Sequence, residues 1–245
     1  RGWELYECAC HILRLRDNLL QRWEGESRKI IRLGASTIPS AYILPELLPA
    51  YGKAHPDTYF SIHQSDSQGI VDGLLQGNFD VGLVGMRCAD EALACIPFYQ
   101  DRMVLITPVN EHFLALKAQG AFPVEALLGE AMILRENGSG SKKSADRFLE
   151  SMGIQESELQ VIARINDQEA IKNLVAQGLG ISILSERAAR NFCEEKRLLG
   201  FELPESAARR SLYLIYQKNY ILKPYIQKFA EFVKRFYPSA EPESA

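Results

Sequence analysis

The stretch ILRENGSGSKKSADRFLE, residues 133–150, predicts a short strand that turns sharply into an amphipathic helix. β-Favouring residues lead to Glu136, and Asn137 to Ser141 supply the glycine and hydroxyl residues of a tight turn. A helix N-terminus leaves backbone N–H groups unpaired and carries a partial positive charge. Small hydroxyl residues there let an anion approach closely, so this turn is a candidate anion site.

A similar turn occurs earlier in the chain. The segment KIIRLGA (29–35) predicts a buried strand, and Ser36-Thr37-Ile38-Pro39 opens a helix that runs through about Tyr51. Taken alone, Ser141 could be a simple N-cap. Two hydroxyl-rich helix ends at equivalent places in two similar units favour one shared anion site.

The strands and helices alternate in two series. Strands predicted at 29–35, 58–65 and 80–85, with helices between them, require a parallel sheet with right-handed crossovers. A second series is predicted with strands at 131–136, 160–166, 181–185 and 199–203. Ligands in such sheets bind outside the carboxyl ends of the strands, so we expect a cleft between the two units.

Two further strands, at 102–108 and 209–217, are expected to connect the units. The final helix begins with Pro224 in its first turn and is expected to return to the first unit. Between 109 and 130 we predict a loop and a short helix at PVEALLGE.

The N-terminal segment WELYECACHILRLRDNLLQRW, residues 3–23, reads as one long helix with Leu5, Ile12 and Leu19 recurring every seven positions. The stripe could pack on the core of its own domain. Because the helix stands at the end of the chain, before the polar break Glu24-Gly25-Glu26-Ser27, we favour pairing with the helix of a second copy.

Composition excludes several classes of protein. The net charge of −3 and the pI near 5.9 argue against a surface that coats nucleic acid. Five cysteines without paired spacing indicate reduced thiols and a cytoplasmic setting. The run Cys8-Ala9-Cys10-His11 is not completed by a second ligand pair, so no metal is expected. The sequence has no apolar run of membrane-spanning length and no secretory pattern at its start.

Motifs for nucleotide binding and nucleophilic catalysis are absent from the sequence. Gly138 to Ser144 reads GSGSKKS, which lacks the spacing of a phosphate-binding GxxxxGK[ST] loop, and no GxGxxG follows the first strand. No GxSxG elbow occurs, and His55, His63 and His112 are dispersed. We therefore predict neither a cofactor nor an enzymatic reaction, although an enzyme on the same fold stays a third possibility.

The chain resembles a LysR-type transcriptional regulator without its N-terminal winged helix-turn-helix domain. Five segments carry the resemblance in order: the helix ELYECACHILRLRDNLL after Arg1-Gly2, then IRLGASTIPSAYILPELLPAYGKAHPDTYFSI, FDVGLVG, MILRENGSGSKKSADRFLESMGI and NDQEAIKNLVAQGLGISILSE. The resemblance implies an α/β fold of two Rossmann-like subdomains, as in type 2 periplasmic binding proteins, preceded by a long linker helix. It departs from the family at Glu111-His112-Phe113, where the family commonly has His-Pro.

The resemblance also implies a division of the chain and a set of ligand-binding residues. Residues 1–27 would be the linker and dimerisation helix, residues 28–101 subdomain I, completed by 217–245, and residues 102–216 subdomain II. A small molecule would lie between the subdomains. The residues implied to bind it are Ser36, Thr37, Gln64, Ser65, Ser139, Gly140, Ser141 and Asn166.

These expectations describe the effector-sensing and oligomerisation region of a cytoplasmic regulator. Its partners would be a small anionic or carboxylate effector and further copies of itself, as a homodimer or homotetramer. It would contact DNA only through the missing N-terminal domain and would not contact a membrane. The alternative is a solute-binding protein of periplasmic type, which would share the fold but should carry an export signal and lack the heptad helix.

Overall fold

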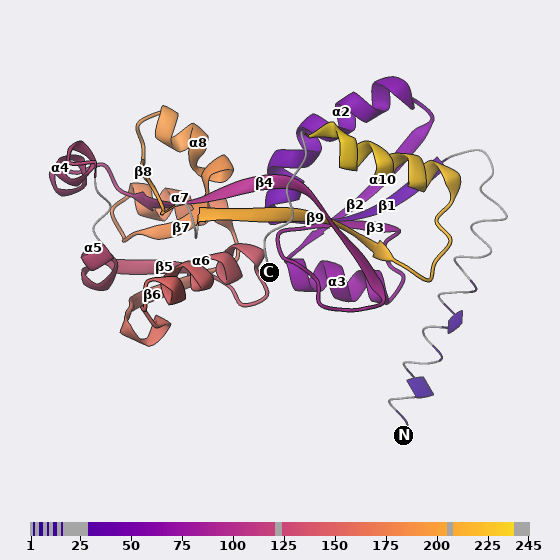
Figure 1. Ribbon diagram of the computed structural model, residues 1–245, viewed down its shortest axis with the longest axis horizontal. Coiled ribbons are helices and arrows are strands. Elements are labelled where there is room, and N and C mark those ends of the chain that lie inside the picture. Colours follow the sequence, from indigo (N-terminus) through magenta and orange to yellow (C-terminus); the bar gives the residue numbers. More distant parts are fainter. Residues whose placement is uncertain are drawn as a thin grey trace.

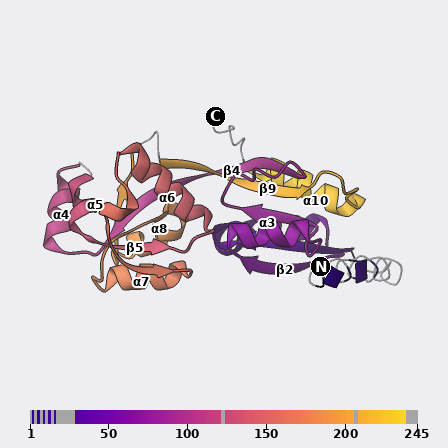
Figure 2. The same ribbon diagram turned by 90° about the horizontal axis from the view of Figure 1, so that it is seen from below.

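The chain folds into two α/β lobes joined by the long strands β4 (Leu93–Thr107) and β9 (Arg209–Gln217) (Figure 1). Figure 2 shows the lobes side by side, with these two strands between them. The structure is a computed structural model, and it describes residues 29–120, 124–204 and 208–237 together with positions 2, 5, 6, 9, 12, 13 and 16.

The first lobe is built on three parallel strands, β1 (Lys29–Ser36), β2 (Thr58–Ser65) and β3 (Val81–Val84). β1 lies in the middle and pairs in parallel with both neighbours, as the alternating pattern predicted. The helices of this lobe are η1 (Pro39–Ile43), α2 (Leu44–Ala54), α3 (Ser67–Leu75) and α10 (Pro224–Phe236).

These helices cover both faces of the first sheet. α2 and α10 share one apolar core, in which Tyr51 and Phe229 meet edge to face at 5.1 Å. α3 packs on the opposite face through Ile70 and Leu74. Covering both faces explains why β3 is buried along its whole length and β1 is buried from Leu33 to Ser36.

The second lobe contains the parallel pair β5 (Ala131–Arg135) and β6 (Gln160–Ile165), and the strands β7 (Ser182–Ser185) and β8 (Leu199–Glu202), which pair antiparallel to β4. A parallel bridge between Met132 and Ile181 joins the two groups of strands. The helices are α4 (Glu111–Ala118), α5 (Val124–Gly129), α6 (Gly140–Ser151), η2 (Glu156–Glu158), α7 (Gln168–Ala176) and α8 (Glu186–Glu194).

The apolar residues of α6 and of α7 lie in two separate cores of this lobe. Phe148 of α6 lies in a core with Met132 and Leu134 of β5. Ile171 of α7 packs with Ile133 of the same strand. Because side chains alternate along a strand, β5 supplies residues to both cores.

The strands β4 and β9 pass through both lobes. They pair antiparallel from Leu93 opposite Gln217 to Arg102 opposite Arg209, and β4 then continues beside β7 and β8. The sequence predicted only residues 102–108 of this strand. The register shifts between Pro97 and Tyr99, because proline cannot donate to the ladder, and the strand continues through this irregularity.

The expected loop after 108 contains a further helix, α4. Asn110 caps it, since its side-chain oxygen accepts a hydrogen bond from the Phe113 amide at 2.9 Å. Phe113 is buried against the second lobe and holds the helix in place. The prediction of a loop from 109 was therefore wrong at Glu111–Ala118. The other strands predicted from sequence are present within one or two residues.

Most of the predicted N-terminal helix, including Leu19, lies outside the described residues. The positions that are described between 2 and 16 are helical. Leu5 is 73% exposed and Ile12 is 60% exposed, so neither of them packs on the core of its own chain. In the part of the chain that the structure describes, no helix is long and apolar enough to cross a membrane.

A buried ion pair joins β4 and β9 where they pass between the lobes. Asp101 lies directly opposite Arg210 in the antiparallel ladder, and the side chains are 2% and 1% exposed. Arg210 Nε and Nη2 lie 2.8 and 2.7 Å from the same Asp101 oxygen. The other carboxylate oxygen accepts a hydrogen bond from Ser185 Oγ at 2.9 Å, so the acid is held on both sides.

We predict that Asp101→Asn lowers the free energy of unfolding by about 3–5 kcal/mol, because Arg210 stays buried without its counterion. The double variant Asp101→Asn/Arg210→Met should cost at least about 1 kcal/mol less than the sum of the two single changes, as expected for contacting residues. Urea unfolding followed by circular dichroism measures all three. Strictly additive losses would contradict a direct interaction between the two side chains.

Candidate functional site

A small cavity lies between the lobes, at the carboxyl ends of β1, β5 and their neighbours. We call it the cleft cavity, and its volume is about 10 Å³. It is lined by Ser36, Thr37, Ile38, Asp66, Ser67, Gly85, Arg135, Ser139, Gly140, Ser141, Gln168 and Arg210. Most of these residues follow a strand or begin a helix, which is the expected place for a ligand in an open α/β sheet.

The backbones of the two lobes touch at one wall of this cavity. A Cβ atom on Gly140, at the start of α6, would overlap the carbonyl group of Gly85, which follows β3. Only glycine therefore lets the N-terminus of α6 come this close to the first lobe. This contact places the amide groups of α6 at the boundary between the lobes.

The hydroxyl groups at the N-terminus of α6 do not act as helix caps. Ser139 is the N-cap residue, and its side chain makes no capping hydrogen bond. Ser141 Oγ instead accepts a hydrogen bond from Arg210 Nη1 at 3.0 Å. Ser139 and Ser141 are both buried beside the cavity, so a role for Ser141 as a simple N-cap does not apply.

Arg135 is the last residue of β5 and brings a guanidinium into the cavity from the second lobe. Its Nε and Nη2 donate to the two carboxylate oxygens of Glu136, each at 2.8 Å. Nη2 also lies 3.3 Å from Thr37 Oγ1 of the first lobe. The side chain is buried, and its Nη1 has no hydrogen-bond partner among the described residues.

Arg210 brings a second guanidinium into the cavity from β9. The pair with Asp101 fixes its orientation, and Nη1 reaches Ser141 across the cavity. The positive charge of each arginine is thus matched by one carboxylate, Glu136 for Arg135 and Asp101 for Arg210. An incoming anion can compete with Glu136, which is partly exposed, far more easily than with the buried Asp101.

Gln168 is the most unusual residue of the cavity. It is the first residue of α7, it is only 2% exposed, and neither its Nε2 nor its Oε1 has a hydrogen-bond partner among the described residues. A buried polar group without a partner costs about 1–3 kcal/mol. Buried amides are normally hydrogen-bonded, so Gln168 supplies a donor and an acceptor suited to a ligand.

Five of the residues predicted from sequence lie together. Ser36, Thr37, Ser139, Gly140 and Ser141 line the same cavity, and the two hydroxyl-rich turns face each other across it. Three others do not line it: Gln64 is exposed and accepts a hydrogen bond from Ser40 Oγ at 3.0 Å, Ser65 is partly buried, and Asn166 is exposed. A ligand-binding role for these three stays a prediction.

Sequence reasoning missed the arginines and Gln168. Arg135 ends the apolar run AMILR and Arg210 precedes the apolar run SLYLIY, and a charged residue bordering a buried strand was the signal that could have found them. Asp66 and Ser67 line the cavity in place of Gln64 and Ser65. Asp66 caps α3 by accepting a hydrogen bond from the Gly69 amide at 2.6 Å, and Ser67 Oγ accepts one from the Gly85 amide at 3.2 Å.

A cluster of polar contacts outside the cavity also spans the lobes. Tyr42, next to the turn at Ser36, donates to Glu169 of α7 at 3.0 Å, and Lys172 lies 2.6 Å from the same carboxylate. Burial, together with the negative charge of Glu169, raises the pKa of Tyr42 well above its usual value. Tyr42 therefore stays neutral across the physiological range and donates a hydrogen bond to Glu169.

The chemistry of the cleft cavity is that of binding. Two guanidinium groups, several hydroxyl groups, an unpaired amide and a helix N-terminus are donors that suit an anion. Within the described residues, no group of three or more His, Cys, Asp or Glu side chains could hold a metal ion. A cavity of about 10 Å³ has room for about one water molecule, so a larger ligand requires the walls to move apart.

Comparison with known proteins finds a match to one protein family that covers most of the chain. Residues 24–238 match the profile of the LysR substrate binding domain. An uncharacterized HTH-type transcriptional regulator of Methanocaldococcus jannaschii is 31% identical over 238 residues, which cover 96% of this chain and 79% of the relative. The RuBisCO operon transcriptional regulator of Allochromatium vinosum is 27% identical over 222 residues, or 90% of this chain and 71% of the relative.

Solved structures give the same fold. The effector binding domain of QuiR in complex with shikimate aligns with a TM-score of 0.75 and 21% identity, covering 86% of this chain and 97% of the other. The regulatory domain of CcmR from Synechocystis PCC6803 in complex with 2-PG aligns with a TM-score of 0.75 and 23% identity, covering 85% and 97%. These likenesses confirm the predicted architecture of two α/β subdomains.

We predict that Gln168→Met stabilises the protein by about 1–3 kcal/mol in the absence of ligand, because it removes two buried polar atoms that have no partner among the described residues. For a chain of this size each kcal/mol corresponds to about 2–4 °C in Tm. Scanning calorimetry measures the shift, and Gln177→Met, at an exposed position at the end of the same helix, is the matched control. A lower Tm for Gln168→Met alone would show that the amide contributes to folding, contrary to this prediction.

Proposed function

Because the chain belongs to the LysR substrate-binding family, we propose that it is the effector-sensing region of a transcriptional regulator and that the cleft cavity binds a small carboxylate or other small anion. The observation that carries the proposal is the set of buried donors that converge from both lobes: Arg135 and Gln168, with unpaired polar atoms, and the hydroxyls of Thr37 and Ser141. Two structural relatives, QuiR and CcmR, were solved with the small molecules shikimate and 2-PG.

The proposed ligand carries a carboxylate or similar anionic group and at least one further hydrogen-bonding group. The anionic group would replace Glu136 on Arg135, because a guanidinium binds a carboxylate through two parallel hydrogen bonds. The amide of Gln168 can both donate and accept, so it suits a hydroxyl group on the same ligand. We assign the role of ligand contact to Ser36, Thr37, Ser139, Gly140 and Ser141 on the same grounds.

Ligand binding would change how the lobes are arranged. The cavity is too small for a carboxylate while Arg135 contacts Thr37 across it, so binding requires these groups to separate. The contacts of Tyr42 with Glu169 and Lys172 span the same boundary and would adjust with them. A ligand shifts such an equilibrium by as much as its affinities for the two arrangements differ.

The remaining parts of the proposal concern the whole regulator. We propose the division into residues 28–101 with 217–245 and residues 102–216 as the two subdomains, with residues 1–27 as the linker helix. The regulator would act in the cytoplasm, as a dimer or tetramer, and the arrangement of the lobes would set the spacing of separate DNA-binding domains on their half-sites. No bond is made or broken in this role. A solute-binding protein is not favoured, because the chain matches the LysR substrate binding domain and the two relatives described above are transcriptional regulators.

Self-association through the N-terminal helix can be tested on the full chain. We predict that the double variant Leu5→Glu/Ile12→Glu has a smaller mass in light scattering than the parent, because charges replace the exposed apolar stripe. The matched control is Leu114→Glu, which places the same charge at an exposed leucine of α4. Equal masses for the parent and the double variant would show that the helix does not contribute to self-association.

The effector site can be tested by a thermal-shift screen of small carboxylates, hydroxycarboxylates, sulfate and phosphate. A compound present at a hundred times its Kd should add about 2.7 kcal/mol of stability. Calorimetry should then show that Arg135→Gln weakens binding of the hit by roughly tenfold or more, since a hydrogen bond to a charged group contributes about 1.5–3 kcal/mol.

Three further variants make the screen specific. Thr37→Val and Ser141→Ala each remove one hydroxyl from opposite walls and should also weaken binding. Glu136→Gln should instead strengthen it, because the competing carboxylate is lost while the shape is kept. A hit that binds Arg135→Gln, Thr37→Val and Ser141→Ala as tightly as the parent would place the effector elsewhere.

A further inference from the structure

A second, larger cavity also borders the contact between Gly85 and Gly140. Its volume is about 350 Å³, and we call it the α6 cavity. The first lobe contributes Met86 and Arg87, the strand β9 contributes Ser211 and Tyr213, and the helix α6 contributes Lys143 and Arg147. Gly85 and Gly140 line both cavities, so the two cavities meet at this contact.

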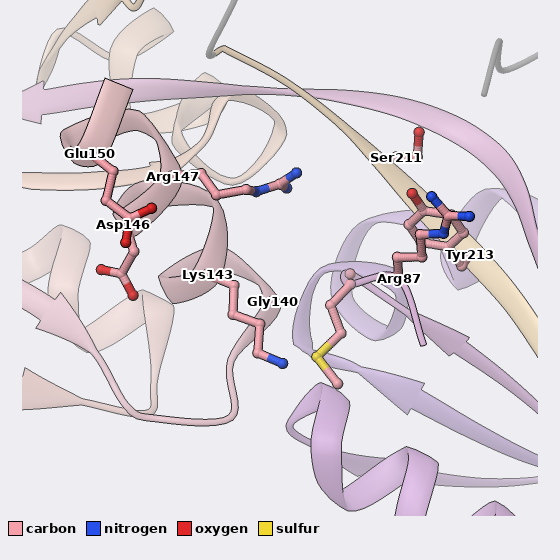
Figure 3. Close-up of a pocket in the computed structure, with 10 residues that line it drawn as sticks. Arg87, Gly140, Lys143, Asp146, Arg147, Glu150, Ser211 and Tyr213 are labelled. Carbon is pink, nitrogen blue, oxygen red and sulfur yellow. The ribbon is translucent and has the colours of Figure 1, made fainter. Parts of the chain in front are cut away.

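The cationic side chains of this cavity come from both lobes. Figure 3 shows Lys143 and Arg147 extending from α6 toward the side of the cavity where Arg87 and Tyr213 lie. Lys143 and Arg147 are four residues apart, which places them on one face of the helix, where like charges repel. Arg87 adds a third positive charge from the opposite wall. A multiply charged anion between them would relieve this repulsion.

Two acidic residues, Asp146 and Glu150, also line the cavity, and the charge of Asp146 is taken up by a lysine outside the lining. Asp146 accepts hydrogen bonds from Lys142 Nζ on both of its oxygens, at 2.6 and 2.7 Å, so its charge is already paired. Lys142 is buried and also pairs with Glu156 at 2.6 Å. Figure 3 shows the carboxylates of Asp146 and Glu150 on the side of α6 away from Arg87 and Tyr213.

The floor of the cavity suits the organic part of a ligand. Met86 and Tyr213 are almost fully buried and belong to the same apolar cluster of the first lobe. Ser211 is buried on the neighbouring stretch of β9. A volume of about 350 Å³ is at the lower end of the range for small-molecule sites. The occupant that fits is a small organic molecule with two or more negative charges.

We propose that the α6 cavity is a second anion site, distinct from the cleft cavity, which takes a small multiply charged anion such as a phosphate ester or a polycarboxylate between Arg87 of the first lobe and Lys143 and Arg147 of α6. The same helix begins with Ser139, Gly140 and Ser141 in the cleft cavity. A ligand in the α6 cavity therefore fixes the position of the helix that also forms the proposed effector site.

The proposal is tested by calorimetry on the full chain with two probes, pyrophosphate and citrate. We expect at least one probe to bind with a Kd below about 1 mM. Tighter binding of pyrophosphate would indicate that the site prefers phosphate groups, and tighter binding of citrate that it prefers carboxylates. Arg87→Gln and Lys143→Gln should each weaken that probe by roughly tenfold. Raising the salt from about 50 to about 200 mM should weaken it too, because the cations are exposed.

Two control variants distinguish binding in the α6 cavity from nonspecific binding and from binding in the cleft cavity. Lys228→Gln removes an exposed lysine from α10, far from either cavity lining, and should leave binding unchanged. Arg135→Gln alters only the cleft cavity and should leave it unchanged as well. All altered side chains except Arg135 are exposed, and circular dichroism checks that each variant is folded.

Three outcomes would overturn the second site. They are no binding of either probe at about 1 mM, unchanged binding in both Arg87→Gln and Lys143→Gln, and loss of binding in Arg135→Gln alone. The last outcome would place the probe in the cleft cavity, and it would support the proposed effector site while removing the second one. If Arg87→Gln and Lys143→Gln weaken binding of the probe, the second site is supported. The proposed effector site is then tested separately, by the compounds found in the thermal-shift screen.

Discussion

The buried pair of Asp101 and Arg210 sets the geometry on which the cleft depends. It lies where β4 and β9 leave the first lobe, and the two residues face each other in the ladder. Asp101 also accepts a hydrogen bond from Ser185 at the end of β7, and Arg210 donates to Ser141 of α6. One ion pair thus connects both crossing strands to two elements of the second lobe. Because both charges are desolvated, neither partner can move without leaving the other uncompensated.

The cleft combines this fixed pair with groups that can change partners. Arg210 is held by an acid that is 2% exposed, whereas Arg135 is held by Glu136, whose side chain is 24% exposed. An anion can replace Glu136 at a low cost, since the released carboxylate can enter water. The contact of Gly140 with Gly85 keeps the N-terminus of α6 beside both arginines. The site is therefore rigid on one side and exchangeable on the other.

Local sequence signals predicted much of the fold and five of the twelve residues that line the cleft cavity. Alternating strands and helices gave the parallel pairing of β1, β2 and β3, and the two hydroxyl-rich turns do line one cavity. A charge beside a buried strand could have marked both arginines, but the contact of Arg210 with Ser141 depends on strand pairing between residues far apart in sequence. At the turns that follow β2 and β6, the position of the helix cap decides which residues line the cleft cavity. Asp66 and Asp167 cap α3 and α7. The cavity is therefore lined by Asp66 and Ser67 rather than Gln64 and Ser65, and by Gln168 rather than Asn166.

The two cavities differ in how far their cationic side chains are buried and paired with carboxylates. In the cleft cavity each guanidinium already has a carboxylate partner, so a ligand there must compete, and selectivity comes from hydroxyl and amide groups that only some anions can satisfy. In the α6 cavity the three cations are exposed, so their attraction for an anion would be weakened by salt and would depend mainly on the charge of the anion. Selective recognition thus requires the desolvated, nearly closed cleft. Under the proposed roles, the open cavity beside it would respond to the concentration of a class of anions, and ligands in both cavities would act on the position of α6.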